Sequence, residues 1–127
     1  MNFKQWTEAN WSQYGYRGVD GLKLNQFKKK GLIPNWRMTT KDQMVYPIQD
    51  ISKPYLFWAD DPDEAKTYGD VILRFTPPTD SVAVSKSLGG TYYVTPSVIP
   101  PTNIEVQTDD GEWKPIQQAQ LQGNFIV

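Results

Sequence analysis

The sequence predicts an α+β domain, with two helices near its start and about half a dozen strands weighted to its second half. One observation is that apolar runs of strand length recur late in the chain, bounded by Pro, Gly or Asp. The other is that capping residues and helical spacing of apolar side chains occur mainly in the first third. Grouping of helices apart from strands is typical of the α+β class.

The length and composition predict one domain that spans residues 1–127, with 39% hydrophobic residues to form its core. Within it we expect an N-terminal helix over residues 1–13, a main body over 14–107 and C-terminal strands over 108–127. The net charge of −1 provides no general attraction to nucleic acid.

The chain contains no cysteine and no histidine. Disulfides, Ser-His-Asp and Cys-His catalysis and the usual zinc sites are therefore excluded, and we expect no metal. No apolar run reaches the length that spans a membrane, and no signal-peptide pattern is recognisable at the N-terminus. We therefore expect a cytoplasmic protein without a membrane partner.

The first third of the chain predicts a helix, a strand and a second helix. Residues 2–13 have amphipathic spacing, and residues 15–19 have the character of a short strand. Asp20 is a suitable N-cap for a helix that runs to about residue 30, and Gly31 suits its end. In this helix we expect Leu22 to face inward, together with Leu24 or Phe27.

The middle of the chain predicts a buried strand, a sharp turn and a short helix. Residues 55–59 form an apolar, aromatic-rich run of strand length. Asp61 can cap the following helix, Pro62 suits its first turn and Glu64 has the spacing of a capping box. Gly69 is placed to end that helix.

Residues 35–53 form a long stretch without sustained periodicity. A loop of this length in a compact domain is usually functional or mobile. We expect it to border a cleft, with Trp36 and Arg37 as contact residues.

The later strands are separated by clear turn signals. Asp109-Asp110-Gly111 predicts a hairpin turn between two of them. The predicted strands are residues 71–75, 82–85, 91–95, 104–107, 113–116 and 124–127.

Three short motifs, in this order, resemble the ADP-ribosyltransferase fold, which includes the poly(ADP-ribose) polymerases and the mono-ADP-ribosyltransferases. The first motif is a strand with Arg before Gly, and the second is a strand, turn and helix with Ala-Asp and a later Tyr. The motifs are Tyr16-Arg17-Gly18 with Gly31-Leu32-Ile33-Pro34, then Phe57-Trp58-Ala59-Asp60 with Ala65 and Tyr68, and then Thr91-Tyr92-Tyr93-Val94 with Ile99-Pro100-Pro101 and Ile104-Glu105-Val106.

The resemblance implies two small, split β-sheets with short helices around a cleft that binds NAD as a substrate. In the family pattern, Arg17 would bind ribose or phosphate and the Gly18 backbone would approach the nicotinamide amide. Phe57 and Tyr68 would line the nicotinamide pocket. A purely structural interpretation stays open for three of these residues. Phe57 and Tyr68 would then belong to the core, and Gly18 would form a tight turn. Arg17 in an apolar strand needs a polar partner in either case.

The family's catalytic glutamate, at the start of the last motif's strand, has no clear equivalent. Thr91 aligns with that position, but a hydroxyl cannot supply the negative charge that stabilises a developing cation. Glu105 is the nearest carboxylate, and it would be catalytic if the alignment slips. The RNA 2′-phosphotransferase branch fits poorly, because its characteristic histidine is missing.

Two functions are therefore compatible with the sequence. The resemblance implies an NAD-dependent mono-ADP-ribosyltransferase that modifies a protein or nucleic-acid acceptor. The alternative is a catalytically inactive protein of the same fold that binds an ADP-ribose-like nucleotide or acts as a protein-interaction module, since 5 Trp and 7 Tyr offer contact surface.

Overall fold

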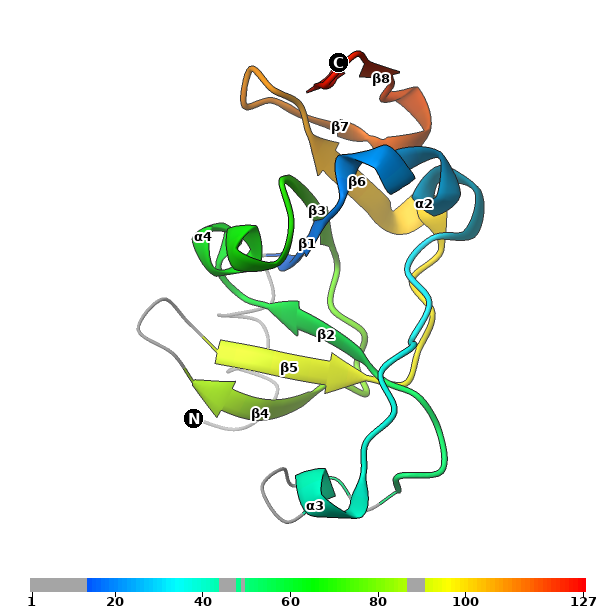
Figure 1. The fold of residues 1–127 in the computed structure, drawn as a ribbon, viewed down its shortest axis with the longest axis vertical. Coiled ribbons are helices and arrows are strands. Elements are labelled where there is room, and N and C mark those ends of the chain that lie inside the picture. Colours follow the sequence, from blue (N-terminus) through cyan, green and yellow to red (C-terminus); the bar gives the residue numbers. More distant parts are fainter. Residues whose placement is uncertain (1–13, 44–47, 49, 87–90) are drawn as a thin grey trace.

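The computed structural model describes residues 14–43, 48, 50–86 and 91–127, and it has the α+β organisation that the sequence predicts (Figure 1). The helix predicted over residues 2–13 lies outside the described residues. The helical elements are η1 Gly21–Lys23, α2 Leu24–Lys30, α3 Thr40–Gln43, α4 Pro62–Ala65, η2 Lys66–Tyr68, η3 Pro101–Asn103 and η4 Ile116–Gln118. The strands are β1 Gly15–Val19, β2 Leu56–Ala59, β3 Val71–Phe75, β4 Val82–Lys86, β5 Thr91–Thr95, β6 Ile104–Gln107, β7 Trp113–Pro115, β8 Leu121–Gln122 and β9 Phe125–Ile126.

The strands form one antiparallel sheet of seven, in the order β4-β5-β2-β1-β3-β6-β7, and a separate ribbon of β8 with β9. The two small, split sheets that the resemblance implies are therefore replaced by one continuous sheet of seven strands in the described structure. However, β1 pairs with β2 at one position only, Tyr16 opposite Ala59, whereas β1 pairs with β3 along all five residues. The sheet is thus nearly divided at its centre, and β1 and β2 separate beyond this pair (Figure 1).

The main core is built on aromatic side chains from the strands on both sides of this division. The Trp58 and Tyr93 rings are stacked, with centroids 4.2 Å apart, and Phe75 meets Trp58 edge-on at 6.1 Å. All three side chains are almost fully buried. A second, smaller cluster joins Met38 and Ile48, from the loop over residues 35–53, with Tyr55 and Val94.

The first predicted helix is present in two pieces, η1 and α2. Asp20 caps it as predicted, because its carboxylate accepts a hydrogen bond from the Leu22 amide at 3.0 Å. Gly31 ends it at φ 74°, in the region that favours glycine. The expectation that Leu22 faces inward is wrong, because its side chain is 77% exposed. The tighter 3₁₀ turn at the start moves Leu22 away from the face that buries Leu24.

The loop over residues 35–53 contains more structure than the sequence predicts. Its start is anchored, since the backbone of Trp36 exchanges two hydrogen bonds with that of Tyr55, at 2.9 and 2.8 Å. It also includes the single turn α3. Among the helices in the described ranges, none is long and apolar enough to cross a membrane.

Candidate functional site

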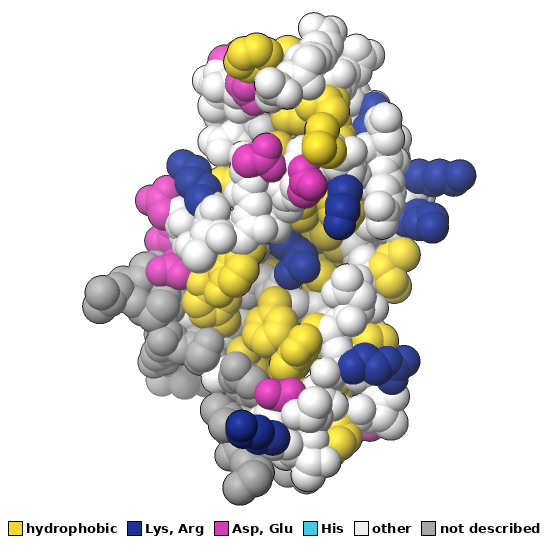
Figure 2. Space-filling view, viewed as in Figure 1, with side chains coloured by type: hydrophobic (Ala, Val, Ile, Leu, Met, Phe, Trp, Pro, Cys, Tyr) yellow, Lys and Arg dark blue, Asp and Glu magenta, His cyan; other side chains and the backbone are white. Residues whose placement is uncertain are grey.

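A cavity of about 560 Å³ opens where β1 and β2 separate. Its walls come from β1 (Tyr16 to Gly18), β2 (Phe57 to Ala59) and the α4–η2 segment (Ala65 and Tyr68), completed by Asn35, Trp36 and Tyr92. Hydrophobic side chains gather around the middle of this face of the molecule (Figure 2). The volume lies within the range typical of small-molecule sites.

The four residues predicted to bind the cofactor all line this cavity: Arg17, Gly18, Phe57 and Tyr68. They come from segments as far apart in sequence as β1 and η2. The pairing of β1 with β2 and the packing of η2 on β1 bring them together. Thr91 and Glu105, the two residues predicted to be catalytic, are not among the lining residues that the structure describes.

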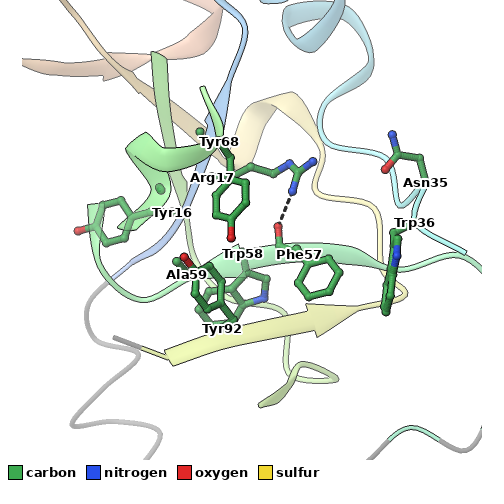
Figure 3. Close-up of a pocket in the computed structure, with 11 residues that line it drawn as sticks. Tyr16, Arg17, Asn35, Trp36, Phe57, Trp58, Ala59, Tyr68 and Tyr92 are labelled. Carbon is green, nitrogen blue, oxygen red and sulfur yellow. Dashed lines mark hydrogen bonds between the residues drawn. The ribbon is translucent and has the colours of Figure 1, made fainter. Parts of the chain in front are cut away.

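Aromatic rings form most of the cavity wall. Successive residues of a strand point to opposite faces, so Phe57 and Ala59 share a face with Tyr92, the cross-strand partner of Ala59. Trp36 packs on Phe57 with ring centroids 4.5 Å apart, and Tyr68 meets Tyr92 edge-on at 5.9 Å. Figure 3 shows Trp36 at one end of the cavity, Tyr68 and Tyr92 at the other, and Arg17 between them. Such walls suit a flat ring.

Arg17 reaches into the gap between the two strands. One guanidinium nitrogen donates a hydrogen bond to the Phe57 carbonyl at 2.8 Å (Figure 3). Burial lowers the pKa of Arg17, although an arginine with so high an ordinary pKa stays charged. Among the residues that the structure describes, no carboxylate forms an ion pair with it. Within the described part of the chain, the Phe57 carbonyl is the acceptor of this guanidinium, which leaves further N–H donors of a positively charged group for a ligand.

Gly18 lies within β1, so the tight-turn interpretation is wrong. A Cβ atom at this position would lie 1.9 Å from the Ala65 carbonyl oxygen and 2.9 Å from the Gly69 amide nitrogen. The missing side chain therefore lets α4 and η2 approach the strand closely, and this approach shapes the cavity wall that carries Tyr68.

The α4 helix brings a carboxylate to the same end of the cavity. Asp61 caps α4 as predicted, with its side chain accepting from the Asp63 amide at 2.7 Å. Glu64 accepts a hydrogen bond from the Tyr92 hydroxyl at 2.5 Å. Sequence reasoning assigned Glu64 to a capping box and did not single out Tyr92, because nothing local indicates that residues 28 positions apart meet.

The backbone of Thr91 makes two hydrogen bonds with Asp60. Its amide donates to the Asp60 carboxylate at 2.9 Å, and its carbonyl accepts from the Asp60 amide at 3.2 Å. Alternation along β5 turns Thr91 to the face opposite Tyr92.

Glu105 lies on β6 and is paired with Arg74 at 2.9 Å. The Arg74 guanidinium is also 4.0 Å from the Tyr14 ring centre and 4.3 Å from that of Trp113. Glu105 therefore belongs to an ion pair outside the described cavity lining, and its arginine partner contacts two aromatic rings.

No family model, curated protein or solved structure matches the chain. In the described ranges, no group of three or more acidic, His or Cys side chains could hold a metal ion. The chemistry of the site is that of a guanidinium with no ion-pair partner among the described residues, flat aromatic walls, and a tyrosine that donates to a carboxylate.

Proposed function

We propose that the cavity binds NAD or a related ADP-ribose-containing nucleotide, and that the chain acts as a mono-ADP-ribosyltransferase on a protein or nucleic-acid acceptor. The observation that carries the proposal is that Arg17 lies without an ion-pair partner among the described residues, in a cavity walled by aromatic rings. A guanidinium pairs well with a phosphate, and a flat nitrogenous ring stacks on aromatic walls. A dinucleotide offers both groups in one molecule.

The near-division of the sheet supports the same proposal. The resemblance implies a cleft between split sheets, with the Arg-Gly pair on one side and the Phe-Trp-Ala-Asp motif on the other. Here β1 and β2 are neighbours joined at one position, and both motifs border the opening.

A second candidate is a nucleotide-binding or protein-interaction module without turnover. The position of the two predicted catalytic residues favours it, because Thr91 and Glu105 lie outside the described cavity lining. A transferase without a glutamate in that place would depend on another carboxylate, either its own or the acceptor's.

Thermal unfolding in the presence of NAD, ADP-ribose or nicotinamide tests the binding proposal. A ligand that binds only the folded state adds about 2.7 kcal/mol at a concentration of about 100 times its Kd. We expect NAD and ADP-ribose to raise the Tm, and nicotinamide to raise it less because it lacks the phosphates. If none of the three changes the Tm, the cavity is not a nucleotide site.

Release of nicotinamide from NAD distinguishes the two candidates. Without an acceptor we expect very slow hydrolysis by the parent, because Thr91 provides no charge to the developing cation. Glu105→Gln is expected to leave the rate unchanged, since Glu105 pairs with Arg74. Loss of a clear parental activity in Glu105→Gln would instead identify Glu105 as catalytic. Binding of NAD with no release under any acceptor condition would favour the module without turnover.

A further inference from the structure

The Tyr92 hydroxyl at the α4 end of the cavity is held by a carboxylate. It donates to Glu64 Oε2 at 2.5 Å, across the end of β2. Tyr92 lines the cavity, and Tyr68 closes the same end with its ring edge-on to that of Tyr92 (Figure 3). The two partners come from β5 and α4, so the contact also ties the cavity wall to the sheet.

This contact determines what the hydroxyl can offer a ligand. A phenol has one proton to donate, and here that proton points to Glu64, so the oxygen is left with lone pairs only. Burial raises the pKa of Tyr92, and the Glu64 and Tyr68 side chains raise it further, so the hydroxyl stays protonated. A hydrogen bond to a charged acceptor also polarises the phenol and strengthens its oxygen as an acceptor.

The opposite chemistry is found at Arg17. A guanidinium has N–H donors and no acceptor. The cavity therefore has a donor-only group between its strands and, at the α4 end, the acceptor-only Tyr92 hydroxyl beside the Tyr68 side chain, which also interacts with it (Figure 3). A ligand that satisfies both carries an anionic group and, separated from it, a hydrogen-bond donor such as a hydroxyl.

We propose that Tyr92, oriented by Glu64, selects a nucleotide that carries a sugar hydroxyl beyond its phosphates. Tyr92 is the specificity-determining residue that contacts the ligand, and Glu64 is a positioning residue that acts through it. The inference rests on the proposed function for the class of ligand, and it adds the group that distinguishes ADP-ribose from ADP.

Calorimetric titration of the full chain with ADP-ribose and with ADP tests this inference. ADP has the adenine and both phosphates, but it lacks the second ribose. We expect the parent to bind ADP-ribose about tenfold more tightly, the size of one good hydrogen bond. Tyr92→Phe and Glu64→Gln are each expected to lose most of this preference, through weaker binding of ADP-ribose and unchanged binding of ADP.

Two matched substitutions outside the cavity serve as controls. Tyr14→Phe and Glu105→Gln remove the same chemical groups near Arg74, and both are expected to keep the parental preference. Thermal unfolding of the ligand-free variants is recorded alongside, because a merely structural role for the Tyr92–Glu64 contact would lower the Tm and leave the preference intact.

The outcomes separate this inference from the proposed function. If the parent binds ADP-ribose and ADP equally, or Tyr92→Phe weakens both to the same degree, the inference is overturned while nucleotide binding stands. If only Tyr92→Phe loses the preference, the positioning role of Glu64 is overturned. If the parent binds neither ligand, the proposed function fails and the inference fails with it.

Discussion

Two arginines on neighbouring strands of the same sheet have opposite surroundings. Arg74 on β3 is paired with Glu105 at 2.9 Å and lies between the rings of Tyr14 and Trp113. Arg17 on β1 has one neutral acceptor, the Phe57 carbonyl at 2.8 Å. The half of the sheet around Arg74 provides its own anion, whereas the gap around Arg17 does not, as far as the described residues go.

This difference explains why one arginine is structural and the other is a binding candidate. Removing a charge from water is costly unless an opposite charge or several dipoles replace the lost hydration. Arg74 has that compensation within the chain, so it gains little from a ligand. Arg17 is compensated only in part, and a phosphate entering the cavity would supply the rest.

The largest effect is expected from Gly18→Ala, which disrupts the packing of α4 on β1 next to Arg17. The new methyl group would lie 1.9 Å from the Ala65 carbonyl oxygen, so α4 has to move away from β1. We expect a loss of about 2–3 kcal/mol in the free energy of unfolding, measured by urea denaturation. The control is Gly111→Ala, where no atom lies within 4 Å and only the backbone at φ 89° is strained. Equal losses in both variants would contradict the close-approach explanation.

A smaller effect is expected from Trp36→Ala, which opens the far end of the cavity. Trp36 packs on Phe57 with ring centroids 4.5 Å apart, and both line the cavity. We expect ADP-ribose to bind about 1 kcal/mol more weakly, the size of one aromatic contact. Calorimetry provides the measurement. Unchanged affinity in a folded variant would show that Trp36 does not contribute to ligand binding.

Glu105→Gln leaves Arg74, like Arg17, without an ion-pair partner in the part of the chain that the structure describes. The pair is partly exposed, with 18% of the Arg74 side chain and 33% of the Glu105 side chain accessible. Solvent screens such pairs, so we expect a loss of about 1 kcal/mol in the free energy of unfolding. Binding of ADP-ribose should not change. Weaker binding would mean that the two halves of the sheet are coupled.

The smallest effect is expected in the hairpin between β6 and β7. The Asp110 carboxylate accepts hydrogen bonds from the Thr108 hydroxyl and the Glu112 amide, and these hold the pKa of Asp110 below its ordinary value. The resulting stabilisation is complete above the unfolded-state pKa and is lost as the pH falls through the lower folded-state pKa.

Hydrogen exchange of the Gly111 amide measures this effect, because that amide is bonded to the Thr108 carbonyl in the turn. We expect faster exchange in Asp110→Asn than in the parent at neutral pH, after correction for intrinsic rates. The difference should shrink in acid, where the parental carboxylate is protonated. A difference that is independent of pH would assign the effect to geometry rather than to charge.

The sequence predicts features that depend on neighbouring residues. The strand over residues 71–75 is an apolar run, the caps at Asp20 and Asp61 use side chains two residues from their amides, and the hairpin turn depends on Gly111. Each of these is specified within a few residues, so periodicity and turn chemistry suffice.

The sequence does not predict features that depend on distant partners. The acceptor of Arg17 lies 40 residues away, and the carboxylate that holds Tyr92 lies 28 residues away on another element. That β1 meets β2 at a single position also depends on the whole sheet. The four residues to which the resemblance assigns cofactor binding line one cavity, but the resemblance did not indicate Tyr92 or Glu64.

Titration of ADP-ribose into the parent, Arg17→Ala and Arg74→Ala tests the central claim most directly. The claim is that Arg17, which has no ion-pair partner among the described residues, binds the ligand's anion, while the paired Arg74 does not. We predict that Arg17→Ala loses about 1.5–3 kcal/mol of binding free energy, the range for a charged hydrogen bond. Arg74→Ala should bind like the parent even though it is less stable. Unchanged affinity in a folded Arg17→Ala variant, or an equal loss in both variants, would contradict the account.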